Sequence, residues 1–130
     1  MSLYMSNPQK SSQLTKFFQS FYHAGEGLKT GLKERSMRIH AAIALIVATV
    51  GIVVGLSQTE WFIVLILIGM VLAAELFNTA IESVCDHIRD DLGLSYQATE
   101  AARDIAAGAV LIIAAFAAII GLWIFLPKFL

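Results

Sequence analysis

The segment Ile105–Leu126, IAAGAVLIIAAFAAIIGLWIFL, contains no formally charged side chain. An α-helix rises about 1.5 Å per residue, so about 20 apolar residues cross the hydrocarbon core of a bilayer. The segment is also rich in Ala and Gly, the small residues that let membrane helices approach one another closely. It therefore predicts a transmembrane helix, which we place at residues 100–126.

Two further apolar segments lie upstream of this one. No formally charged side chain occurs from Ile39 to Thr59, which predicts a first transmembrane helix at residues 39–58. Trp61 opens the next segment, at a position typical of an interfacial aromatic residue. Its helical pattern continues past Glu75, so we predict a second transmembrane helix at residues 61–87.

The composition supports a membrane location. The chain has 130 residues, of which 58% are hydrophobic, and its mean hydropathy is +0.74. A soluble domain of this size cannot bury so much apolar surface in one core. The net charge of −1 argues against a nucleic-acid partner, and the single cysteine, Cys85, excludes a disulfide framework and indicates a packing role. The sequence thus predicts an all-α membrane protein.

The region before the first span has a different pattern. Within residues 13–33, aromatic and aliphatic side chains alternate with charged ones, which predicts an amphipathic helix on the membrane surface. A soluble docking helix is the alternative. Residues 1–12 are polar, and we interpret them as a disordered tail or a remnant of cloning. Residues 13–130 then form a single domain.

Positively charged residues predict the orientation. Arg89 and Arg103 lie between the second and third spans, and Lys128 follows the third. Because Lys and Arg favour the cytoplasmic side, the N-terminus and the 86–103 loop are predicted to be cytoplasmic and the C-terminus to be outside. The other positive residues all precede the first span: Lys10, Lys16, Lys29, Lys33, Arg35 and Arg38.

Polar residues interrupt the second helix in a regular pattern. In the segment ELFNTAIESVCD, residues 75–86, four polar positions recur at helical spacing: Glu75, Asn78, Glu82 and Asp86. At about 100° per residue, they lie within about 80° of one another on one helix face. An Asp carboxylate at the bilayer centre costs about 2.5–3.5 kcal/mol, so such a stripe indicates a functional site.

Two other interpretations of this stripe remain open. In the first interpretation, Glu75 and Glu82 belong to an interhelical hydrogen-bond network. In the second, they conduct protons or ions. Conduction requires a polar path that continues toward the outside, and Ile63–Met70 offers almost none.

Charged residues also flank the membrane at Glu34 and at Arg103-Asp104. Taken alone, Asp104 is explained as a carboxylate at a helix N-terminus and Glu34 as a solvated charge. The sequence lacks a G-x-x-x-x-G-K-[ST] loop and the signature motifs of protein kinases. Its three histidines are too scattered for a zinc site.

The segment AELFNTAIESVCD, residues 74–86, resembles the signature of the small integral-membrane prokaryotic diacylglycerol kinases and their undecaprenol kinase relatives. Glu34–His40 and Ala102–Leu111 agree with that family in order and spacing. The resemblance covers about residues 17–128. It implies a homotrimer in the bacterial cytoplasmic membrane, with active sites shared between subunits at the cytoplasmic face. It also implies transfer of the γ-phosphoryl group of ATP to a lipid alcohol.

The resemblance implies roles for particular residues. Glu75 matches the general base that takes the proton from the lipid hydroxyl. Glu34 and Glu82 match carboxylates that hold Mg²⁺ against the ATP phosphates, and carboxylate oxygens suit Mg²⁺. Arg103 replaces the usual Lys, which keeps the positive charge but changes the geometry of a phosphate contact. Further residues expected in this site, or beside the nucleotide, are Asn78, Asp104, Asp86 and His23.

The expected substrate is undecaprenol, because the segments Arg38–His40 and Leu126–Lys128 are similar to those of the Gram-positive-type members. Diacylglycerol is the alternative within the same enzyme class. A non-enzymatic membrane protein, such as a small channel or an assembly subunit, is the hypothesis from a different class.

Overall fold

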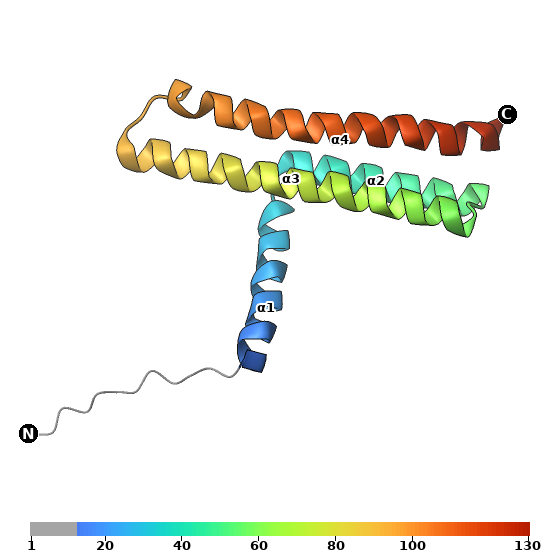
Figure 1. Cartoon of the computed structure of the whole chain (residues 1–130), viewed down its shortest axis with the longest axis horizontal. Helices are drawn as coiled ribbons and strands as arrows, with labels where there is room; N and C mark the ends of the chain where they lie inside the picture. Colours follow the sequence, from blue (N-terminus) through green and yellow to red (C-terminus); the bar gives the residue numbers. More distant parts are fainter. Residues whose placement is uncertain (1–12) are drawn as a thin grey trace, which may run out of the picture.

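The protein is described here by a computed structural model that places residues 13–130. Its helices are α1 (Gln13–Gly31), α2 (Arg35–Val54), α3 (Gln58–Leu92) and α4 (Gln97–Phe129). Figure 1 shows α3 packed beside α2 and α4, while α1 leaves these three helices sideways. The predicted all-helical fold with three long apolar helices is confirmed. The predicted N-terminal tail lies outside the described residues.

A tight turn joins α2 to α3. Gly55 adopts φ = 69°, and the N–H of Leu56 donates to the carbonyl of Gly51 at 3.1 Å. This left-handed glycine and its hydrogen bond form the usual C-terminal cap of a helix. Ser57 and Glu60 then make a capping box, in which each side chain accepts from the other residue's backbone N–H. Because of this cap, α3 begins at Gln58, before the expected start at residue 61.

Helix α4 extends beyond the expected range of 100–126 at both ends. It continues through Pro127 to Phe129. Lys128 Nζ lies 3.0 Å from a carboxylate oxygen of Glu60, which ties this last turn to the first turn of α3. A proline removes one backbone hydrogen-bond donor. It need not end a helix whose final turn is held by a contact with another helix, as the Lys128–Glu60 pair holds this one.

The helix lengths locate Glu75 with respect to a membrane. Helix α3 has 35 residues and is therefore about 52 Å long, longer than the hydrocarbon core of about 30 Å. One end of α3 must project into water or headgroups. Glu75 follows Gln58 by about 26 Å along the helix axis, so a hydrocarbon core that begins at Gln58 ends close to Glu75.

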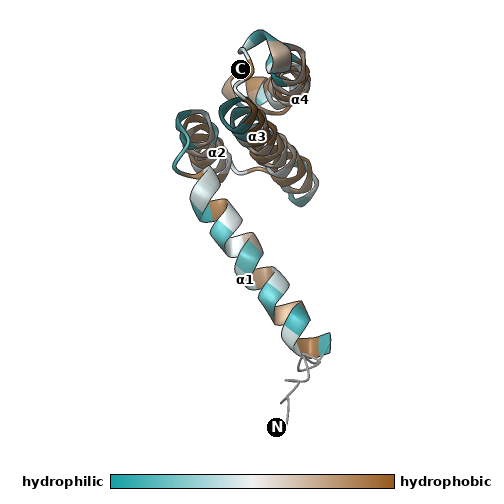
Figure 2. Ribbon diagram, turned by 90° about the vertical axis from the view of Figure 1, so that its left-hand side faces the viewer, coloured by the Kyte–Doolittle hydropathy of each residue, from teal (hydrophilic) through white to brown (hydrophobic). Residues whose placement is uncertain are grey.

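The outer surface of the three long helices is apolar. Figure 2 shows hydrophobic colouring along most of α2, α3 and α4, and mixed colouring along α1. Large side chains such as Val53, Leu111 and Trp123 remain more than two-thirds exposed. A water-soluble protein rarely exposes apolar surface on this scale. The chain is therefore a membrane protein, with lipid covering what the helices leave bare.

We predict that Gly51→Leu weakens the packing of α2 against α3. A Cβ atom at position 51 would lie 2.9 Å from Leu56 Cδ1 and 3.0 Å from Trp61 Cη2. Overpacking of this kind costs about 1–3 kcal/mol. Thermal unfolding in detergent should show a lower midpoint for Gly51→Leu. Gly69→Leu is the control, because no neighbour among residues 13–130 lies within 4 Å of a Cβ atom there. An equal loss in both variants would contradict the prediction.

Candidate functional site

The buried carboxylate of Glu75 forms the centre of the candidate site. Glu75 is 3% exposed. Ser36, in the first turn of α2, donates a hydrogen bond from its hydroxyl to Glu75 Oε1. His40 Nδ1 lies 3.8 Å from the other carboxylate oxygen, Oε2. A buried carboxylate requires such partners, and here α2 supplies them.

Ser36 and His40 reach the same carboxylate because they are four residues apart, on one face of α2. Neither residue was predicted to belong to the site. The signal was available in the segment Glu34–His40, where Ser36 and His40 lie one turn apart at the start of the helix that leads into the apolar span.

One turn further along α3 lies a second polar pair. Asn78 Nδ2 donates to Glu82 Oε1 at 3.1 Å. Asn78 is 8% exposed, and its Oδ1 atom is buried without a hydrogen-bond partner among the described residues. A buried acceptor without a partner is costly, typically by about 1–3 kcal/mol. This oxygen therefore lacks the partner that a buried acceptor requires.

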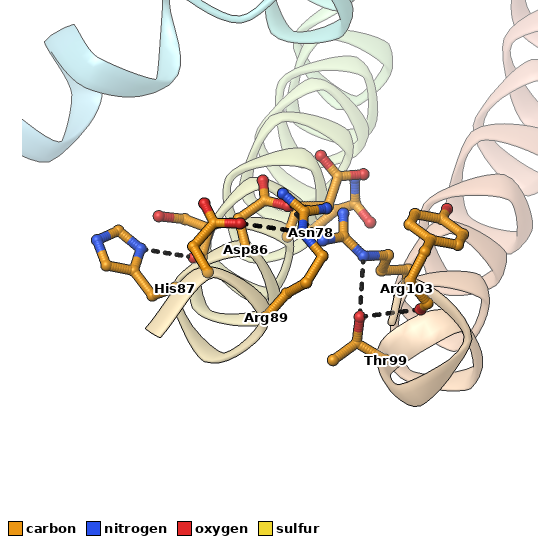
Figure 3. A network of polar contacts seen from close by, with 10 residues as sticks. Asn78, Asp86, His87, Arg89, Thr99 and Arg103 are labelled. Carbon is orange, nitrogen blue, oxygen red and sulfur yellow. Dashed lines mark hydrogen bonds and ion pairs between the residues drawn. The ribbon is translucent and has the colours of Figure 1, made fainter. Parts of the chain in front are cut away.

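A third cluster joins the ends of α3 and α4 (Figure 3). Arg103 Nη2 donates to Asp86 Oδ1 at 2.5 Å, and its Nε donates to Thr99 Oγ1 at 3.4 Å. The guanidinium also lies 5.2 Å from the centre of the Tyr96 ring. Arg89 Nη1 approaches the same Asp86 oxygen at 3.1 Å, so two cations share one carboxylate.

We predict that Arg103→Lys destabilises the α3–α4 contact by about 1 kcal/mol, because one ammonium group cannot reproduce these separate contacts. The unfolding midpoint in detergent measures the loss. Arg89→Lys is the matched control, since the ion pairs of Arg89 with Asp86 and Asp90 stay within α3 in the part of the chain that the structure describes. A drop in Arg89→Lys as large as that in Arg103→Lys would refute the interhelical role.

The remaining predicted site residues do not converge on this centre within one chain. Glu34 is exposed at the N-cap of α2, and Asp104 is exposed in α4. His23 is exposed in α1, with its ring edge-on to that of Tyr22. Two of the predicted stripe residues, Asn78 and Glu82, do lie in direct contact.

The oxygen atoms of this site are of the kind that binds a hard cation. Within residues 13–130, however, no group of three or more His, Cys, Asp or Glu residues gathers around a common point. Glu82 and the unpartnered Asn78 Oδ1 offer oxygen atoms, which Mg²⁺ prefers. Mg²⁺ commonly takes one or two carboxylates and completes its shell with water and substrate phosphates. These residues therefore fit the ion.

Comparison with known proteins connects this geometry to a family. The family model described as prokaryotic diacylglycerol kinase matches residues 22–125. The chain is 45% identical to an undecaprenol kinase of Bacillus subtilis over 125 residues, covering 95% of this chain and 99% of that protein. It is 34% identical to a diacylglycerol kinase of a Synechocystis species over 113 residues, covering 85% of this chain and 63% of the relative. No solved structure gives a significant match.

Proposed function

Since this chain belongs to the prokaryotic diacylglycerol kinase family, we propose that it is a lipid kinase that transfers the γ-phosphoryl group of ATP to undecaprenol. The observation that carries the proposal is the buried Glu75 carboxylate near a membrane boundary, with one oxygen bonded to Ser36 and the other facing His40. A base at this depth lies between the membrane, which holds the lipid alcohol, and the water, which holds the nucleotide.

The reaction follows from the two carboxylate oxygens of Glu75. Ser36 occupies Oε1 and fixes the rotamer, which leaves Oε2 to accept the proton of the lipid hydroxyl. As the O–H bond breaks, the alcohol oxygen bonds to the γ-phosphorus. The bond from that phosphorus to its bridging oxygen breaks, and ADP leaves with the electron pair. Most of the rate gain in such transfers comes from positioning and charge stabilisation.

We assign Glu34, Glu82 and Asn78 to the Mg²⁺ and phosphate side of this site. Bound Mg²⁺ supplies neutralising charge for the ATP phosphates. Arg103 and Asp104 belong to the nucleotide side, with Asp86 and His23 as further contacts. Arg103 is held by Asp86 and Thr99 in the free chain, so its guanidinium is fixed in position between α3 and α4.

The proposed assembly is a homotrimer with active sites shared between subunits. Glu34 and Asp104 are exposed in a single chain. Residues that complete the active site of a neighbouring subunit would be exposed in this way. The exposed aromatic side chains of α1, among them Phe17, Phe18 and Phe21, support a helix lying on the membrane surface. The excess of Lys and Arg before α2 supports a cytoplasmic N-terminus and a cytoplasmic active site.

Diacylglycerol is the alternative substrate, favoured by the name of the family and of the Synechocystis relative. The test offers both lipids in equal amounts in mixed micelles with labelled ATP, and chromatography separates the two phosphorylated products. We expect most of the label in undecaprenyl phosphate. A majority of label in phosphatidic acid would keep the kinase and overturn the choice of substrate.

A further inference from the structure

Two cations share the carboxylate of Asp86 at the junction of α3 and α4 (Figure 3). Arg103 Nη2 and Arg89 Nη1 contact the same oxygen, Asp86 Oδ1, at 2.5 and 3.1 Å. Arg103 reaches this oxygen from α4, whereas Arg89 reaches it from the next turn of α3. One negative charge thus has two positive partners, so one partner can leave while the other still neutralises the carboxylate.

The guanidinium of Arg103 has three contacts, and one of them is with an anion. Its Nη2 donates to Asp86, its Nε donates to Thr99 Oγ1, and its carbon lies 5.2 Å from the centre of the Tyr96 ring. Thr99 and Tyr96 are uncharged and leave the positive charge of Arg103 uncompensated. A phosphate group that binds Arg103 therefore competes with the Asp86 carboxylate and not with the other two contacts.

Asp86 remains beside the phosphate after such an exchange of partners. Its side chain is 46% exposed, against 13% for that of Arg103, so an anion that approaches from water meets the carboxylate next to the guanidinium. A carboxylate without a cation would repel the phosphate at this distance. Arg89 already contacts Asp86 within α3 and neutralises it without any movement of α4.

We propose that Arg89 is a positioning residue for nucleotide binding, which retains Asp86 when a phosphate of the nucleotide replaces Asp86 on Arg103. The inference rests on the proposed kinase function, in which Arg103 belongs to the nucleotide side of the site. In the free chain, the Asp86–Arg103 pair joins α3 to α4. In the nucleotide-bound chain, the Asp86–Arg89 pair remains within α3, and Arg89 acts on the nucleotide only through these two residues.

The first experiment measures the kinetics of Arg89→Gln and Arg89→Lys with undecaprenol and MgATP in mixed micelles. We expect Arg89→Gln to raise KM for ATP about tenfold, an effect typical of a lost hydrogen bond to a charged group. Its kcat and its KM for undecaprenol should stay within about twofold of the wild type. Arg89→Lys should keep KM for ATP within about threefold, because an ammonium group also pairs with a carboxylate.

Three results of this experiment would overturn the role of Arg89. They are an unchanged KM for ATP in Arg89→Gln, an equal rise in both variants, and a rise in KM for both substrates together with a lower unfolding midpoint, as a structural role predicts. Asp90→Asn is the control, since Arg89 Nε also contacts Asp90 Oδ1 at 3.1 Å. It should leave KM for ATP unchanged, and a tenfold rise there would assign the effect to Asp90 instead.

The second experiment repeats Arg89→Gln in an Asp86→Asn background. Asparagine has nearly the shape of aspartate but no charge, so no carboxylate remains for Arg89 to neutralise. We expect the tenfold effect of Arg89→Gln on KM for ATP to shrink to within about twofold. The reference is the Asp86→Asn variant, so any contribution of Asp86 itself cancels. A tenfold effect that persists would mean that Arg89 contacts the nucleotide directly, which would overturn the inference.

A failure of the kinase function is distinguishable from a failure of this inference. A wild-type protein that transfers phosphate to neither undecaprenol nor diacylglycerol would reject the kinase function, and the role of Arg89 with it. A wild-type protein that is active, with an Arg89→Gln variant that binds ATP equally well, would reject the role of Arg89 alone.

Discussion

Glu75→Gln is expected to lower phosphate transfer to undecaprenol by about 10²- to 10⁴-fold, the range attributed to a general base. Glutamine has nearly the same volume, and its amide oxygen can still accept the Ser36 hydrogen bond. The position facing His40, however, can no longer accept a proton. The loss should appear in kcat, because the substitution removes an interaction made in the transition state.

Glu60→Gln is the matched control for this variant. Glu60 belongs to the capping box at the opposite end of α3, and Gln also serves in that motif. The control should retain kcat within about twofold. The base assignment would fail if Glu75→Gln kept a third or more of the wild-type kcat, or if Glu60→Gln lost as much as Glu75→Gln.

The second large effect concerns nucleotide binding. A ligand that binds the folded state stabilises it by about 2.7 kcal/mol at a concentration of 100 Kd. MgATP should therefore raise the unfolding midpoint of the wild-type protein in detergent. Glu82→Gln is expected to abolish that rise, because it removes the carboxylate that Asn78 orients and that we assign to Mg²⁺.

Glu100→Gln is the control, since Glu100 is exposed in the first turn of α4 and has no assigned role in the site. It should keep the full shift with MgATP. A channel or an assembly subunit predicts no shift in the wild type. A full shift in Glu82→Gln would instead leave the kinase hypothesis intact and remove Glu82 from the ion site.

The fold was predictable because its main determinants are local. Uncharged segments long enough to cross a bilayer, such as Ile105–Leu126, predict helices without knowledge of any tertiary contact. The ends of the helices were less predictable. The start of α3 depends on the reciprocal Ser57–Glu60 cap, and the end of α4 depends on an ion pair between Lys128 and Glu60, which are 68 positions apart.

The candidate site was predictable to the extent that it lies on one helix. Periodicity places Asn78 and Glu82 on one face of α3, and their contact follows from that spacing. The partners of Glu75 are different, because Ser36 and His40 come from another helix and depend on how α2 packs against α3. Sequence periodicity holds no information on that packing.

The most direct test of the central claim uses the purified protein in vesicles that contain undecaprenol as the sole lipid alcohol. Labelled ATP and Mg²⁺ are added outside, and the label in the extracted lipid is followed over time. We predict labelled undecaprenyl phosphate from the wild-type protein and a background level from Glu75→Gln. Label that stays entirely in the aqueous phase, with protein shown to be folded, would contradict a lipid kinase built around Glu75.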